Sequence, residues 1–190
     1  MGRRIEEKYE NGTNIAEFVD KMEPLGEDRK TIFLPDTPPE KLVELGGATL
    51  GIFLAKIMSA LEAKFGEEVW EVAKKAAYDI GCSRAAGMAR VMKIDPTDAR
   101  SLGRIHDMEN NGMGIKCEWT ETGRRRAVGR IFSCPLAKPA KESPKICSTI
   151  LEAMERGTFD ALGVKMKKPI LTKLMPLGDP YCEVTDELEE

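Results

Sequence analysis

The sequence lacks a long hydrophobic run, an export signal and an excess of charge of one sign. Nowhere in its 190 residues do eighteen consecutive apolar residues occur, whereas a transmembrane helix needs about 20. The N-terminus has two arginines but no apolar stretch behind them, so it does not resemble a signal peptide. The 29 basic and 32 acidic residues nearly cancel, which gives no cationic surface for nucleic acid or an anionic membrane. We therefore expect a cytoplasmic protein that binds neither nucleic acid nor membrane.

Several familiar motifs are also missing. The chain has no Cys-x-x-Cys pair and no His-Glu-x-x-His helix, the spacings typical of zinc sites. Gly46 and Gly47 do not form a phosphate loop, because no strand precedes them and no Lys-Ser/Thr follows. The five cysteines are an odd number in a chain without an export signal. They are therefore interpreted as reduced thiols or metal ligands, not as a disulfide framework.

The length fits one domain that buries most of a core without cross-links. Residues 1–39 are charged and mixed and end in prolines, which predicts an N-terminal arm. Residues 40–190 are expected to form a single α+β domain. Helical spacing of apolar residues predicts helices over about 40–64 and 67–92, and Asp95-Pro96 indicates the start of a third that runs to about Met108.

The hydrophobic period changes to that of strands after residue 114. Alternating side chains over 115–120 and 127–132 predict a hairpin. Residues 145–162 return to helical spacing, and a second hairpin is expected from 169–175 and 181–185. Helices, hairpin, helix and hairpin in this order predict an α+β fold, with an antiparallel sheet of hairpins covered by helices on one face.

Three cysteines in the last third of the chain are the strongest candidates for chemistry. Cys134 precedes a proline, Cys147 lies at a helix start, and Cys182 follows a Gly-Asp turn. Each lies at a boundary between elements, where thiolates from a sheet end and a helix can meet. Three thiolates with one more group, either His106 or Asp179, would complete a tetrahedral zinc site or leave a position open for water. The alternative is three ordinary buried cysteines, since free cysteine is among the most buried residue types.

His106 is the single histidine of the chain. It lies on the helix face of Leu102 and Ile105, near the helix C-terminus, where the helix dipole favours the protonated imidazole. It is a candidate base, metal ligand or hydrogen-bond donor, and the alternative is a partly buried histidine that only packs.

Several segments carry a family resemblance. They are Phe65–Val72, Tyr78–Gly81, Cys134-Pro135, Cys147 and Gly178–Val184. Together they resemble the L-2-amino-thiazoline-4-carboxylic acid hydrolase family. That family is similar in layout to the 4-vinyl reductase domains, which include bacterial phenol sensors and relatives of a vesicle-tethering subunit.

The resemblance covers about residues 40 to 187 and implies a 4-vinyl-reductase-like ligand-binding fold. Such folds have a pocket between the helices and the sheet and are often dimeric. In the hydrolases, water adds to the thiazoline carbon between sulfur and nitrogen. In the sensors, cysteines near the last hairpin hold a structural zinc beside a pocket for an aromatic ligand.

The match to the sensor cysteines is partial. Cys182 corresponds to the last of them and Cys147 to the first. Where the sensors have another cysteine and an acid before the Gly-Asp turn, this chain has Leu174 and Lys173. A metal site in this chain therefore has to recruit Cys134, as the hydrolase-like Cys-Pro motif suggests.

Two functions follow as hypotheses. The first is a hydrolase that opens a C–N bond of a thiazoline-like or other small heterocycle. A zinc ion held by Cys134, Cys147 and Cys182 would activate water while His106 moves protons, or Cys134 would act as the nucleophile. The alternative is a non-catalytic small-molecule-binding module with a structural zinc or an iron–sulfur cluster. We expect a homodimer, because the apolar residues 32–34 of the arm would otherwise be partly exposed.

Overall fold

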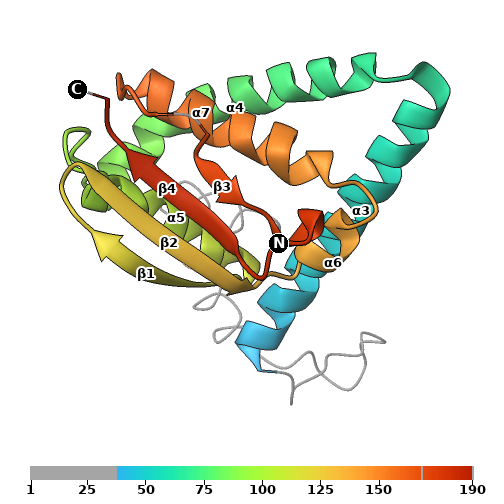
Figure 1. Ribbon diagram of the computed structural model, residues 1–190, viewed down its shortest axis with the longest axis horizontal. Helices are drawn as coiled ribbons and strands as arrows, with labels where there is room; N and C mark the ends of the chain where they lie inside the picture. Colours follow the sequence, from blue (N-terminus) through green and yellow to red (C-terminus); the bar gives the residue numbers. More distant parts are fainter. Residues whose placement is uncertain (1–37, 168, 190) are drawn as a thin grey trace, which may run out of the picture. The chain divides into compact units, whose positions relative to one another are not determined.

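The computed structural model describes residues 38–167 and 169–189 (Figure 1). The chain divides into two units, Met1–Leu42 and Val43–Glu190, and the fold described below is that of the second unit. The predicted arm, including its apolar residues 32–34, lies outside the described residues except for its last two positions. The division into an arm and one domain therefore stays a prediction.

Four strands form one antiparallel sheet. They are β1 (Lys116–Thr122), β2 (Arg126–Ser133), β3 (Leu171–Lys173) and β4 (Cys182–Glu187). The order in the sheet is β1-β2-β4-β3, so the two sequence-local hairpins join through the β2–β4 pair. The predicted antiparallel sheet of hairpins is confirmed.

Long helices account for most of the remaining chain. They are α3 (Pro39–Phe65), α4 (Glu68–Met92), α5 (Ala99–Met113) and α7 (Glu152–Ala161). A π-helical segment, η1 (Ile146–Leu151), leads directly into α7. The bounds of α3, α4 and η1–α7 agree with the predicted helices to within a few residues.

The predicted bounds of α5 are wrong at both ends. The helix begins after Asp98, whose carboxylate accepts the backbone N–H of Arg100 at 3.0 Å and caps the first turn. At the other end Asn111 and Gly112 lie within the helix, and it ends only at Gly114, whose φ of 68° provides the left-handed cap. The extra turn extends α5 beyond His106 and Glu109.

Two short elements replace loop and strand that the sequence predicted. A helical turn, α6 (Ala137–Ala140), overlaps the start of the loop that was expected between Pro139 and Pro144. The third strand ends at Lys173, earlier than predicted, because the 3-10 turn η2 (Met175–Leu177) follows it. These turns place Cys134 and Cys182 at neighbouring ends of the sheet.

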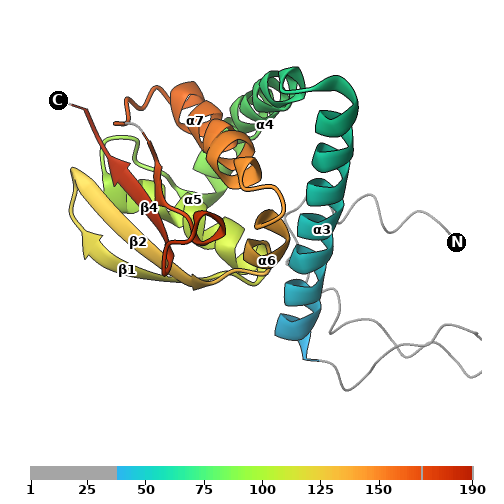
Figure 2. The same cartoon turned by 45° about the vertical axis from the view of Figure 1, so that its right-hand side comes forward.

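The core lies between the sheet and the helices. Helix α5 packs against β1, β2 and β4, while α7 packs closely along α4 (Figure 2). The largest fully buried side chains belong to this layer, and they include Phe159, Leu102, Ile105, Met166, Ile170 and Val184. The α+β architecture with helices packed on the sheet is therefore confirmed.

The contact between α4 and α7 depends on two glycines. A Cβ atom on Gly81 would lie 2.1 Å from the carbonyl oxygen of Met154, and one on Gly157 would lie 2.2 Å from that of Tyr78. Neither distance is compatible with a side chain, so the absence of both Cβ atoms lets the two helix backbones approach. This close approach fixes the position of α7 and of the Glu155 side chain that it carries.

Helix α3 exposes much of its apolar surface. Its exposed large hydrophobic residues are Leu45, Leu50, Ile52, Phe53, Ile57, Leu61 and Phe65. By length and composition alone, α3 is apolar enough to cross a membrane, with a mean hydropathy of 1.5 over its best window. Core helices of soluble proteins pass the same test, but only 22% of this window is buried. The helix therefore presents an apolar surface that the described residues leave uncovered.

Candidate functional site

A pocket opens between the helices and the sheet. Its cavity volume is about 90 Å³, and the cavity is partly open to solvent. Helices α5 and α7, segment η1 and strands β2, β3 and β4 all contribute to its wall. The apolar wall residues are Met113, Ile115, Ile131, Leu136, Leu151, Met154, Leu171, Leu174 and Val184. A mostly apolar wall with a few polar groups is typical of a small-molecule site.

The three cysteines singled out from the sequence all line this pocket. Cys134 follows β2, Cys147 lies in η1, and Cys182 is the first residue of β4. The Sγ atom of Cys182 accepts the backbone N–H of Met175 at 3.2 Å. Asp179, a candidate fourth ligand, instead accepts the backbone N–H of Leu174 at 2.8 Å and stabilises the turn.

The thiols of these cysteines are held in their neutral form. Burial raises the pKa of Cys134 to about 11 and that of Cys147 to about 12, and it also raises the pKa of Cys182. A thiol is nucleophilic only as its thiolate. At neutral pH, therefore, the protein environment by itself does not activate Cys134 as a nucleophile.

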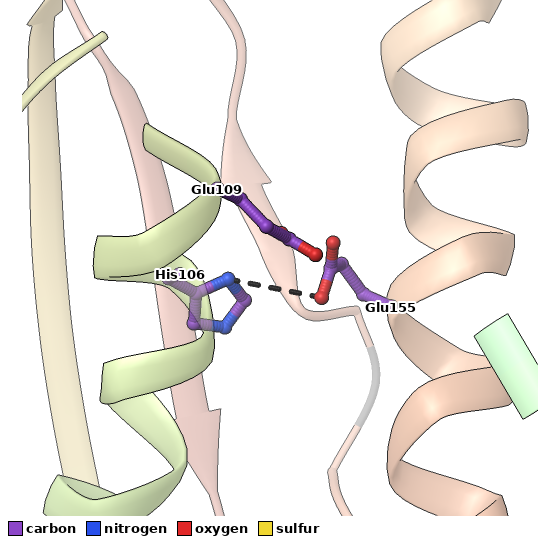
Figure 3. Close-up of side chains that lie close together, drawn as sticks. All are labelled: His106, Glu109 and Glu155. Carbon is purple, nitrogen blue, oxygen red and sulfur yellow. Dashed lines mark ion pairs between the residues drawn. The ribbon is translucent and has the colours of Figure 1, made fainter. Parts of the chain in front are cut away.

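A buried polar cluster also contributes to the pocket wall. His106 is 6% exposed, and its Nε2 lies 3.0 Å from Oδ1 of Asp186 on β4. Its Nδ1 faces Oε2 of Glu155 on α7 at 3.8 Å (Figure 3). Glu109, one turn further along α5, points toward the same Glu155 carboxylate. Arg84 of α4 pairs with both glutamates, with its Nη2 lying 3.3 Å from Oε1 of Glu155.

The cluster shifts the pKa of two of its members. Burial opposes the charged imidazole of His106, but the charge of Asp186 and its hydrogen bond outweigh burial and raise the pKa to about 10. Burial and the charge of Glu155 raise the pKa of Glu109 to about 8, although the positive charges of His106 and Arg84 lower it. At neutral pH the imidazole is thus a cation that Asp186 stabilises.

The donor atoms of His106, Glu109 and Glu155 all lie within 4.8 Å of one another. Among the described residues, the three pocket cysteines do not form a set of this kind. The proposed cysteine site for zinc or an iron–sulfur cluster therefore stays a prediction, and so does the catalytic role of Cys134.

Sequence reasoning missed Glu109, Glu155 and Asp186. The three-residue spacing of His106 and Glu109 places both on one helix face and was a usable signal. Asp186 had no such signal, because it lies 80 residues from His106 and is fully buried in a strand.

A scan against protein-family models found no match, and a search of curated proteins found none either. A search of solved structures found the crystal structure of a trafficking protein particle complex subunit 3 from Naegleria fowleri, covalently bound to palmitic acid. The match has a TM-score of 0.54 at 14% sequence identity and covers 77% of this chain and 97% of that chain.

The fold is thus shared with this trafficking subunit. It is the 4-vinyl-reductase-like α+β fold that the sequence resemblance implied. At 14% identity the likeness shows the fold alone, so the function has to be argued from the pocket.

Proposed function

We propose that the protein is a small-molecule-binding module whose pocket takes an apolar ligand, such as an acyl chain. The observation that carries the proposal is the pocket itself, whose wall is made mostly of aliphatic and methionine side chains. Concave sites with such walls and a few polar groups are typical of small-molecule binding. The palmitic acid on the trafficking subunit of similar fold supports this ligand class.

The proposal is for reversible binding. Attachment of an acyl group as a thioester needs a thiolate, and burial raises the pKa of Cys134 and Cys147 well above neutral.

Filling the pocket is expected to weaken ligand binding. Leu151→Trp adds an indole to the pocket wall, whereas Leu177→Trp makes the same change at a residue that is 62% exposed and outside the wall. Titration with palmitate, followed by calorimetry, should show saturable binding to wild type and Leu177→Trp. Leu151→Trp should weaken it at least about tenfold, or about 1.4 kcal/mol. Equal binding by both variants, or no binding by wild type, would contradict the proposal.

The hydrolase is the second candidate, because His106 and Cys134 both line the pocket. Its weakness is that neither group is in its reactive form at neutral pH, since the pKa of His106 is raised to about 10 and that of Cys134 to about 11. A thiazoline-opening assay on wild type and Leu151→Trp distinguishes the two. Turnover that disappears in Leu151→Trp would favour the hydrolase.

We also propose a homodimer, with α3 as its contact surface. Phe53 and Ile52 are 61% and 52% exposed, and burying such side chains against a second copy is favourable. Light scattering at micromolar concentration is expected to give the mass of a dimer for wild type and of a monomer for Phe53→Glu. A wild-type monomer would rule out the dimer.

A further inference from the structure

The donor set around Glu155 has the composition of a metal site. His106 and Glu109 lie three residues apart on one face of α5, and Glu155 faces them from α7 (Figure 3). The separation of 3.8 Å between Nδ1 of His106 and Oε2 of Glu155 is close to the spacing of about 3.4 Å between neighbouring ligands of a tetrahedral zinc ion. Small side-chain rotations therefore suffice to place the three donors around one ion.

Asp186 orients the imidazole for this role. Its Oδ1 lies 3.0 Å from Nε2 of His106 and can only accept a hydrogen bond when the carboxylate is charged. Nε2 then keeps its proton, and a metal ion at Nδ1 would replace the second proton of the cationic imidazole. A carboxylate behind the histidine is the usual support of a metal-bound imidazole.

The second, independent observation is an unpartnered oxygen. Glu155 is 5% exposed, and its buried Oε2 makes no hydrogen bond. A buried carboxylate oxygen without a partner is costly. Arg84 contacts the other oxygen of Glu155 and one oxygen of Glu109, which orients both carboxylates. Without a metal, protons on His106 and Glu109 offset the carboxylate charges; a divalent cation would displace both protons and restore the same balance.

We propose that His106, Glu109 and Glu155 bind one divalent transition-metal ion, with Asp186 as the positioning residue behind the histidine. One imidazole and two carboxylates suit Zn²⁺, Mn²⁺ or Fe²⁺. Three protein ligands leave a position open, and all three residues line the pocket, so a donor atom of the pocket ligand can occupy it. This site is separate from the ligand proposal, because zinc binding is measurable with the pocket empty.

Zinc titration by calorimetry of the full chain, freed of metal with a chelator, tests the site. Wild type is expected to bind one equivalent. Glu109→Gln and Glu155→Gln should each weaken binding at least about tenfold, and Asp186→Asn by about 10–100-fold. Glu71→Gln, which removes a carboxylate that is 78% exposed, is the matched control and should bind like wild type.

The cysteine site predicted from the sequence gives the opposite pattern. The double variant Cys147→Ser, Cys182→Ser should keep zinc binding if the histidine and glutamates hold the ion. Cobalt(II) added to wild type distinguishes the two sites, because thiolate ligands give an intense charge-transfer band and imidazole and carboxylate ligands do not. This test works even if a cluster variant fails to fold. No binding, a thiolate band, or unchanged binding in a folded Glu155→Gln would overturn the proposal.

Discussion

Gly157→Ala is expected to destabilise the protein by about 3 kcal/mol or more. The added Cβ would lie 2.2 Å from the carbonyl oxygen of Tyr78, so α4 and α7 would have to separate. Overpacking of this kind typically costs 1–3 kcal/mol and occasionally more, and here the clash is with backbone, which cannot rotate away. Urea unfolding followed by circular dichroism measures the change.

Gly87→Ala is the matched control on α4. Nothing lies within 4 Å of its Cβ position, so the same substitution meets open space. It should stabilise the protein by up to about 1 kcal/mol, because alanine favours the helix interior over glycine. Equal effects of the two substitutions would show that the close contact of α4 with α7 is not real.

The second large effect expected is a loss of stability with rising pH. Glu109 has an ordinary pKa of 4.5 and a folded pKa of about 8, while His106 has values of 6.5 and about 10. Both folded values are raised, so each contribution is fully present below the ordinary pKa and is lost as pH rises through the folded one. The free energy of unfolding is therefore expected to fall between about pH 5 and pH 10.

Urea unfolding at pH 6 and pH 9, in the presence of a chelator, checks this expectation. The decrease should be at least about 1.4 kcal/mol, the equivalent of a single pKa unit. Glu109→Gln, which mimics the protonated carboxyl, should flatten the part of the profile below pH 8, whereas the exposed control Glu71→Gln should not. If the stability of Glu109→Gln changed with pH as that of wild type does, Glu109 would not be the group that holds the buried proton.

The fold was largely predictable from local patterns. Alternation over 115–120 and 127–132 and helical spacing over 145–162 correspond to elements in the structure. Errors arose where two signals of the same kind competed, as at the end of α5, where Gly114 caps the helix instead of Gly112. Gly112 follows Asn110 and Asn111, which is the stronger local stop signal, yet the helix continues through it to Met113.

The candidate site was predictable only in part. Cys134, Cys147 and Cys182 lie at element boundaries, and all three line the same pocket, whereas their proposed metal site stays a prediction. The charged cluster was not predicted, because it pairs residues of α5 and α7 whose contact depends on how two helices pack. Buried acids are rare, and their sequence pattern is the same as that of exposed acids on a helix.

The central claim is that the pocket between α5, α7 and the sheet binds an apolar ligand. Methionine methyl NMR tests it most directly, because Met113 and Met154 line the pocket while Met58 and Met88 are buried in the core and do not line it. Addition of palmitate is expected to shift the methyl signals of Met113 and Met154 saturably and to leave those of Met58 and Met88 nearly unchanged. Shifts confined to Met58 and Met88, or no shift at all, would contradict the account.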